Sequence, residues 1–253
     1  MLLLGHRGCR GEFMENTFAA FDHAMECGCD GFEFDVRLSA DGIPVVWHDA
    51  RLRGRAIARH DFGSLRERCA KESPHIRQLL ANVGHPRRVD HTPRIRQLRA
   101  DGYNPRRGAI ALCCLEEVLA RYAHVAWMDI ELKARGLEAA VVELVRRYRP
   151  ARGFVLSSFR RPVLLELHRI DAGLPLGFIF DRMPREKTWR GLPVQFVKPS
   201  ARVVTPARVR QFHAAGMKVL TWTVNHPAAM RRLSEAGVDG MIGDDPRALA
   251  QGR

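Results

Sequence analysis

The sequence of 253 residues contains no apolar run that approaches the ~20 residues of a membrane-spanning helix. Met1–Gly5 is too short for the apolar core of a secretory signal, and no basic stretch precedes it, so we expect a cytoplasmic protein. None of the six cysteines forms a paired Cys-x-x-Cys set, which argues for reduced thiols rather than a disulfide framework. Cys27 and Cys29 could bind a metal, but no second pair completes such a site.

Two catalytic motifs are also absent. Without a Gly-x-x-x-x-Gly-Lys loop, hydrolysis of nucleoside triphosphates is disfavoured, and without Gly-x-Ser-x-Gly an acyl hydrolase is disfavoured. Apolar residues nevertheless make up 46% of the chain, which is enough for a sizeable core. The length suits one large domain or two small ones, and an α/β barrel often fills it alone.

Positive charge is abundant, and it is concentrated in one segment. The formal net charge is +13, and between Arg51 and Gly108 the 14 Arg and one Lys outnumber the acidic residues by 10. We interpret residues 51–108 as an insertion after the third strand, because the segment interrupts the strand and helix pattern. It could attract phosphorylated head groups, dock on an anionic membrane or form a solvated surface. Poor aromatic interleaving disfavours nucleic-acid binding, and nothing in the sequence indicates an oligomeric state.

Short apolar runs alternate with helical patterns along the rest of the chain. Such repeated units predict a parallel sheet, closed or open. One of the nine predicted strands would lie outside an eight-stranded barrel. The predicted strands are Leu2–His6, Gly31–Arg37, Pro44–His48, Val125–Lys133, Phe154–Phe159, Leu176–Phe180, Phe196–Pro199, Val219–Val224 and Gly240–Ile242. The predicted helices are Thr17–Cys27, Leu115–Tyr122, Leu137–Tyr148, Val163–Ile170, Ala207–Ala215 and Ala228–Ala236.

Ionisable residues gather at the ends of the first four predicted strands, where parallel barrels carry their reactive groups. Strand alternation places Glu33 and Asp35 on one face, so that they would point into the barrel mouth. Buried carboxylates need a counter-charge, and hard oxygen ligands suit Mg²⁺ or Ca²⁺. The residues concerned are His6 and Arg7, Glu33 and Asp35, His48 and Asp49, and Glu131 and Lys133.

Other interpretations of these residues remain open. Glu33 and Asp35 could face solvent on an edge strand, and Lys133 could neutralise Glu131 without a metal. We interpret Asn16 as the N-cap of the first helix rather than a ligand. If the ionisable residues do meet, then a cation with an Arg and a Lys favours a phosphate substrate. Two histidines could divide the roles of general base and general acid.

Several stretches of the chain resemble the glycerophosphodiester phosphodiesterase family. They follow the family's order across nearly the whole chain outside residues 51–108. The stretches are HRG (6–8), ENTFAAF (15–21), FEFDVRLSADGIPVVWHD (32–49), CLEEVL (114–119), DIELK (129–133), SSF (157–159), WTVN (222–225) and GVDGMIGDDP (237–246).

The resemblance implies a TIM barrel with an insertion after the His-Asp strand. It implies hydrolysis of glycerophosphodiesters to an alcohol and glycerol 3-phosphate, through a cyclic phosphate or by direct attack of water. It also implies site residues: His6 and His48 as the acid–base pair, Glu33, Asp35 and Glu131 as ligands of Mg²⁺ or Ca²⁺, Arg7 and Lys133 as the phosphate clamp, and Trp222 as a wall of the pocket.

Three departures from the family pattern lie beside the expected site. Met14 replaces a usual proline, Arg53-Gly54-Arg55 replaces a frequent Thr-Thr, and Leu112-Cys113-Cys114 replaces Ile-Pro-Thr. They leave the choice of leaving group open. Alternatives are a lysophospholipase D-like activity on lysolipids and a non-catalytic barrel that binds phosphorylated ligands, although retention of both histidines argues against the latter.

Overall fold

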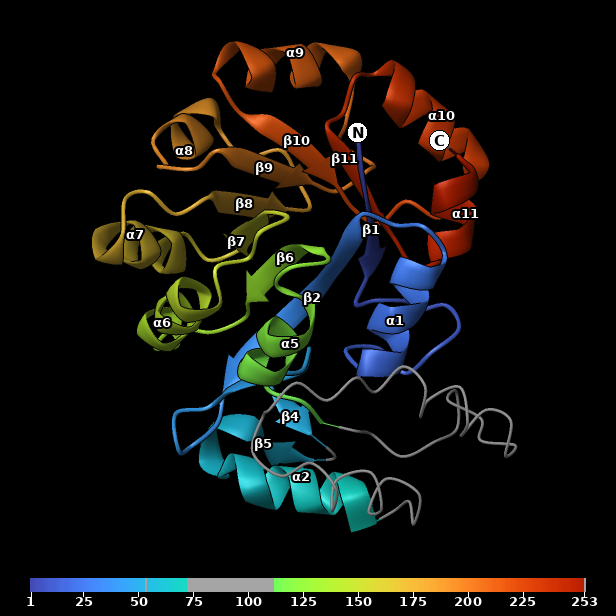
Figure 1. The fold of residues 1–253 in the computed structure, drawn as a ribbon. Coiled ribbons are helices and arrows are strands. Elements are labelled where there is room, and N and C mark those ends of the chain that lie inside the picture. Colours follow the sequence, from blue (N-terminus) through green and yellow to red (C-terminus); the bar gives the residue numbers. More distant parts are fainter. Residues whose placement is uncertain (53, 72–111, 253) are drawn as a thin grey trace.

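The computed structural model of the chain describes residues 1–52, 54–71 and 112–252. Within these ranges eight parallel strands form a closed barrel, because β1 pairs with β11 on one side and with β2 on the other. The predicted TIM barrel is confirmed, and helices surround the ring of strands (Figure 1). The barrel strands are β1 (Leu2–His6), β2 (Gly31–Leu38), β6 (Trp127–Leu132), β7 (Phe154–Ser158), β8 (Leu176–Phe180), β9 (Phe196–Pro199), β10 (Lys218–Thr221) and β11 (Gly240–Gly243).

Helices follow most of the barrel strands, and local signals set where they begin. Thr17, Thr205 and Asp245 each accept a hydrogen bond from the backbone N–H three residues further on. The six predicted helices are confirmed to within two residues at each end, whereas α8 and α11 had no counterpart in the predicted pattern. The helices around the barrel are α1 (Phe18–Glu26), α5 (Leu115–Tyr122), α6 (Glu138–Tyr148), α7 (Arg161–Ile170), α8 (Glu186–Arg190), α9 (Pro206–Ala214), α10 (Pro227–Glu235) and α11 (Pro246–Gln251).

Alternate residues along the strands separate two apolar cores. Phe32, Phe34 and Val36 point outward from β2 into the large core that lies beneath the helices. A smaller core fills the barrel interior toward the amino ends of the strands. It consists of Leu4, Trp127, Val155, Phe196, Leu220 and Ile242.

Three buried polar residues, which we call the inner triad, lie inside the barrel: Asp129 on β6, Ser157 on β7 and Lys198 on β9. Lys198 forms an ion pair with Asp129. Ser157 Oγ donates to Asp129 Oδ1 at 2.6 Å and accepts from Lys198 Nζ at 2.9 Å. Lys198 crosses β8 at Gly177, where an added Cβ would lie 3.3 Å from its Cδ. Glycine therefore leaves the space that lets the lysine reach its partner.

The third predicted strand, Pro44–His48, is the one of the nine that lies outside the barrel, and the expectation that it runs parallel to its neighbours is wrong. β3 (Pro44–Val46) runs antiparallel to β2 and is the ninth strand of the sheet, outside the barrel. The chain turns back at Asp41-Gly42, where Gly42 has a φ of +78°. Such an Asp-Gly pair favours a hairpin rather than a crossover. The strand that follows β2 in the barrel is β6.

The described part of the predicted insertion packs beside the barrel, below β2 and α5 in Figure 1. It comprises β4 (Arg51–Leu52), β5 (Arg55–Ala56), η1 (Ile57–Arg59) and α2 (Phe62–Lys71). Leu52, Ile57 and Leu65 form a small core with Val45, and Met14 packs against it. Residues 72–108 of the predicted insertion lie outside the described residues, so the insertion as a whole stays a prediction.

No helix within the described ranges is both long enough and apolar enough to cross a bilayer. The cytoplasmic location stays a prediction.

Candidate functional site

β1 and the residue after it carry the first two site residues to the barrel rim. His6 ends β1, and Arg7 has a φ of +50°, so the backbone turns at once. The turn aims the N–H of Arg7 at Oε2 of Glu33, 3.1 Å away. Nε2 of His6 lies 3.8 Å from the same oxygen. The first strand thus delivers an imidazole and a backbone N–H to the carboxylate of Glu33 on its neighbour β2.

Asp244, which directly follows β11, holds the other ring nitrogen of His6. Its Oδ1 lies 2.6 Å from Nδ1 of His6, and its Oδ2 accepts a hydrogen bond from Nδ2 of Asn225 at 2.6 Å. Burial works to raise the pKa of Asp244, but the contact with His6 outweighs it and lowers that pKa. An ionised Asp244 would accept a hydrogen bond from Nδ1–H and leave Nε2 of His6 directed toward Glu33.

Neither Asp244 nor Asn225 is among the predicted site residues, although both stand in motifs that match the family. The sequence signal was present, because a polar pair after two successive barrel strands lies on one rim. The sequence did not show that the two residues contact each other. Asn225 Oδ1 accepts the N–H of Asp244 at 2.9 Å, although a helix and a strand separate the two residues along the chain.

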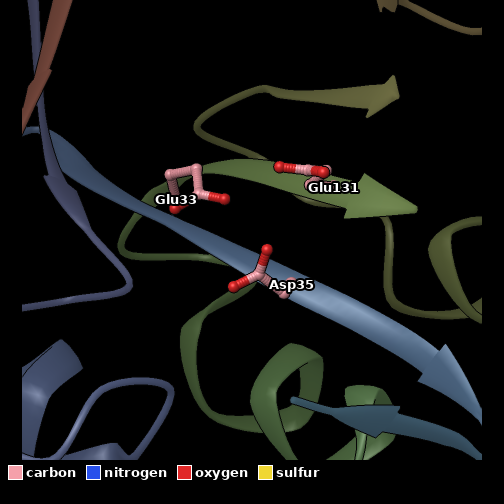
Figure 2. A group of neighbouring side chains, drawn as sticks. All are labelled: Glu33, Asp35 and Glu131. Carbon is pink, nitrogen blue, oxygen red and sulfur yellow. The ribbon is translucent and has the colours of Figure 1, made fainter. Parts of the chain in front are cut away.

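Three buried carboxylates, which we call the acid cluster, point toward a common space: Glu33 and Asp35 on β2 and Glu131 on β6 (Figure 2). One oxygen of each lies within 4.8 Å of the others. The register of the two strands explains this, because Asp35 lies opposite Glu131. The predicted convergence of these three side chains is therefore observed.

Burial and mutual repulsion shift the pKa values of the carboxyl groups in the acid cluster. Burial raises the pKa of Glu33 well above its usual value, and the charge of Asp35 raises it further. Burial and Asp35 also raise the pKa of Glu131. Burial acts on Asp35 in the same direction, but Lys133 and Arg7 outweigh it and lower the pKa of Asp35. The cluster thus holds more negative charge than its surroundings balance.

The two cations predicted to bind phosphate lie against the acid cluster. Nζ of Lys133 is 2.6 Å from Oε1 of Glu131 and 3.4 Å from Oδ1 of Asp35. Nε of Arg7 is 3.1 Å from Oδ2 of Asp35, and its Nη1 is 2.8 Å from Oε1 of Glu15. Both cations therefore form ion pairs with carboxylates.

The predicted role of Asn16 as a helix cap is wrong. Thr17 caps α1, since its Oγ1 accepts the N–H of Ala20. Asn16 is buried and has a φ of +59°, and its side chain turns toward β2. Its Nδ2 donates to Oδ2 of Asp35 at 3.0 Å, and its Oδ1 accepts the N–H of Asp35 at 3.2 Å. Asn16 therefore orients a member of the acid cluster.

His48 reaches the site by the hairpin and not at the end of a parallel strand. The N–H of Trp47 donates to the carbonyl of Asp35, so His48 follows directly beside β2. Its Nδ1 lies 2.7 Å from Oδ1 of Asp49, and its charge acts on the carboxylate of Asp35. His6 thus lies beside Glu33, whereas His48 follows the residue that hydrogen-bonds the backbone of Asp35 and has Asp49 as its close side-chain partner among the described residues.

Trp222, predicted to form a pocket wall, lies against a second aromatic ring. Its indole packs edge-on against Phe159 with 5.5 Å between ring centroids, and its Nε1 donates to the carbonyl of Lys198. Phe159 is 41% exposed, and Nζ of Lys133 lies 5.7 Å from its centroid. Phe159 thus lies between Lys133 and Trp222, and the role of Trp222 as a pocket wall stays a prediction.

The donor set of the acid cluster fits a divalent cation. Its carboxylates supply the hard oxygen ligands that Mg²⁺ and Ca²⁺ prefer. Oδ1 of Asp35 is buried and accepts no hydrogen bond from the described residues, with Nζ of Lys133 3.4 Å away. Among the described residues, the three buried carboxylates contact only two Lys or Arg side chains, Arg7 and Lys133, so the charge balance favours one more positive group.

Comparison with known proteins agrees with this geometry. The profile of the Glycerophosphoryl diester phosphodiesterase family matches residues 6–248. A protein of Caldanaerobacter subterraneus named glycerophosphodiester phosphodiesterase is 27% identical, and the match covers 98% of this chain and 96% of that protein. The human protein named lysophospholipase D GDPD3 is 23% identical, over 96% of this chain and 82% of its own.

Solved structures share the barrel. The glycerophosphodiester phosphodiesterase of Thermotoga maritima matches with a TM-score of 0.74 at 24% identity, covering 100% of this chain and 98% of that one. A phosphodiesterase of Oleispira antarctica, solved in complex with the product sn-glycerol-3-phosphate, matches with a TM-score of 0.76 at 23% identity. That match covers 100% of this chain and 96% of the other.

Proposed function

Because this chain belongs to the glycerophosphoryl diester phosphodiesterase family, we propose that it hydrolyses glycerophosphodiesters to glycerol 3-phosphate and an alcohol. One observation carries the proposal: three buried carboxylates converge at the rim of the barrel where His6 lies 3.8 Å from Glu33 and where the hairpin brings His48 next to the backbone of β2. The names of the relatives support the same substrate class. We also infer that the whole chain forms one barrel domain.

Glu33, Asp35 and Glu131 would hold a divalent cation, Mg²⁺ or Ca²⁺. When bound, such an ion stabilises the negative charge that develops on the oxygens of a reacting phosphate. Arg7 and Lys133 would then be released in part from the carboxylates that they now balance. Their guanidinium and ammonium groups could bind the phosphate oxygens from the protein side.

His6 and His48 would transfer protons on the two sides of the reacting phosphorus, one at the attacking oxygen and one at the leaving oxygen. Asp244 accepts from Nδ1 of His6 and so keeps Nε2 available on the side of the site. Asp49 holds Nδ1 of His48 in the same way. One imidazole would accept a proton from the attacking group, which is either water or the neighbouring hydroxyl of glycerol. The other would donate a proton to the leaving alcohol. When the glycerol hydroxyl attacks, the product is a cyclic phosphate, which a water molecule would then open to glycerol 3-phosphate.

A direct assay tests the proposal. Purified full-length protein is incubated with glycerophosphocholine and with glycerophosphoglycerol, and release of glycerol 3-phosphate is measured with Mg²⁺, with Ca²⁺ and with EDTA. We expect release that EDTA abolishes and either metal restores. His6→Ala or His48→Ala should lower turnover by about 10²–10⁴-fold. Both variants should unfold at a temperature close to the parent's, because the side chains lie at the rim.

Two outcomes would contradict the proposal. Release of glycerol 3-phosphate that persists in EDTA would show that the reaction needs no metal. Absence of release with metal bound would favour a barrel that only binds phosphorylated ligands. Binding of glycerol 3-phosphate without turnover, measured by calorimetry, would identify that second case.

Lysophospholipase D-like activity is the second candidate. The observation that favours it is the exposed ring of Phe159 beside Trp222, an apolar surface that an acyl chain could cover. A human relative carries that name. Lysophosphatidylcholine and glycerophosphocholine share a head group, so their ratio of kcat/KM values separates the two activities. Phe159→Ser should lower turnover of the lysolipid alone.

A further inference from the structure

Arg37 is the next residue of β2 that shares a face with Glu33 and Asp35. Alternation along the strand therefore places it at the barrel mouth, beyond the acid cluster. It is half-buried, and it lies opposite Val45 of the antiparallel strand β3. The proposed reaction uses Arg7 and Lys133 as its cations and leaves Arg37 without a role.

The contacts of Arg37 differ from those of the other two cations. Its Nε donates to the carbonyl oxygen of His48 at 2.7 Å, which is a neutral acceptor. No carboxylate of the described residues lies within 4.0 Å of its nitrogens, whereas Arg7 and Lys133 each form close ion pairs with the acid cluster. Arg37 has therefore lost part of its hydration without a matching ion pair.

The charges around Arg37 do not supply the missing anion at close range. Asp35, Asp49 and Glu131 attract it from beyond that distance, and Arg160 repels it. Of these acids, Asp49 is held by Nδ1 of His48, and the other two face the cations of the acid cluster. Arg37 thus lies at the rim among acids that are already in contact with other groups, and it has no close anion of its own among the described residues.

This asymmetry bears on which end of a substrate meets Arg37. A phosphate held between His6 and His48 would carry one ester group toward each histidine. Glycerol offers only neutral hydroxyls, so an anionic group on the side of His48 has to belong to the other alcohol. A guanidinium binds phosphate and carboxylate oxygens with two parallel hydrogen bonds, which makes it a selective group at such a position.

We infer that Arg37 determines substrate specificity by binding a negatively charged group on the leaving alcohol. The preferred substrates are then glycerophosphodiesters whose alcohol carries a phosphate or a carboxylate. The inference rests on the proposed function and adds to it the chemical class of the head group. Arg37 binds the part of the substrate that does not react.

Two substrates that differ by one phosphate test the inference. Glycerophosphoglycerol has a neutral leaving alcohol, and glycerophosphoglycerol phosphate has the same alcohol with a phosphate monoester. We measure kcat/KM for both with the full chain, with free Mg²⁺ held constant because the monoester itself binds the ion. The parent protein should prefer the charged substrate by about 10–100-fold, which is the range for a hydrogen bond between charged groups. The preference should appear in KM more than in kcat.

Arg37→Gln should remove this preference and leave kcat/KM for glycerophosphoglycerol within about threefold of the parent value. Arg37→Lys keeps the charge but not the paired donors, so it should retain part of the preference. It also serves if Arg37→Gln does not fold, as judged by thermal unfolding. Arg152→Gln is the matched control, because Arg152 is exposed and precedes β7 at the opposite end of the barrel. It removes one positive charge and should leave kcat/KM unchanged for both substrates.

Three results would overturn the inference. The parent could show no preference for the charged substrate. Arg37→Gln could lower kcat/KM equally for both substrates, which would mean that Arg37 binds the reacting phosphate or orients His48 through its carbonyl. The preference could also survive in Arg37→Gln. If the parent turns over glycerophosphocholine but neither of these two substrates, the inference alone fails. If it turns over none of the three, the proposed function fails and this inference fails with it. Turnover of glycerophosphoglycerol without a preference contradicts the inference alone.

Discussion

The inner triad and the acid cluster meet on β6, where Asp129 belongs to one and Glu131 to the other. Their strand partners are equally close, since Glu33 lies opposite Asp129 and Asp35 opposite Glu131. Both groups are buried, yet their charges are arranged differently. In the inner triad one carboxylate meets one ammonium, and a hydroxyl occupies the remaining oxygen.

The acid cluster has no such balance. Three carboxylates share the close charges of Arg7 and Lys133, and Arg7 also contacts Glu15, while Lys198 acts on Glu33 and Glu131 without a close contact. Burial first, and the charge of Asp35 second, raise the pKa values of Glu33 and Glu131, so the fully ionised cluster is costly. A closed ion pair such as Asp129 with Lys198 completes a fold, whereas an excess of like charge indicates a binding site. The two groups should therefore respond in opposite ways to substitution.

Removal of a carboxylate from the acid cluster should have the largest effect, and on function alone. Glu33→Ala should abolish the heat of Mg²⁺ binding in calorimetry and lower turnover by about 10³-fold, the worth of several kcal/mol of charge stabilisation. Metal-free stability should stay within about 1 kcal/mol, because the lost contacts are offset by lower repulsion. Glu143→Ala on the exposed face of α6 is the control. Unchanged metal affinity would remove Glu33 from the ligand set.

Removal of the cation from the inner triad should affect stability first. Lys198→Met leaves Asp129 buried without its counter-charge, which costs about 3–5 kcal/mol. Urea unfolding of the metal-free protein measures the loss, with Lys187→Met on exposed α8 as the control. A loss below about 1 kcal/mol would show that Asp129 is balanced by some other group.

The sequence sufficed for the parts of this comparison that depend on strand alternation. Glu33, Asp35 and Glu131 could be placed on one face because their neighbours Phe32, Phe34 and Ile130 needed an apolar core. The direction of β3 was missed, although Asp41-Gly42 between two apolar runs is itself a hairpin signal. The apolar residues of β3 alone do not show whether the strand runs parallel or antiparallel to β2.

The inner triad was beyond prediction from the sequence. Lys198 stands in the apolar stretch FVKP, where nothing local shows that Asp129 lies across the barrel. The same holds for Asn16, because Asn16 and Thr17 are both cap-forming residues and only the contact with Asp35 separates their roles. Such pairings depend on closure of the barrel, which brings distant strands together.

The support of His6 should give a smaller effect than the acid cluster itself. Asp244→Asn replaces the carboxylate that holds Nδ1 of His6, and turnover should fall by about 10–100-fold, as for other groups that orient a reacting imidazole. KM should change little, because binding of the phosphate is left to other residues. Asp245→Asn is a matched neighbour that caps α11, and it should leave turnover unchanged. Equal losses in both variants would assign Asp244 to structure only.

The smallest effect should come from replacing the inner triad as a whole. Asp129→Leu, Ser157→Ala and Lys198→Met together exchange a closed ion pair for apolar side chains of similar volume, a change that is often neutral or stabilising. The triple variant should therefore recover most of the stability lost in Lys198→Met and unfold within about 1.5 kcal/mol of the parent. Turnover should stay within about tenfold, because the acid cluster keeps all its members. Loss of metal binding in the triple variant would contradict the separation of the two groups and would make Lys198 part of the site.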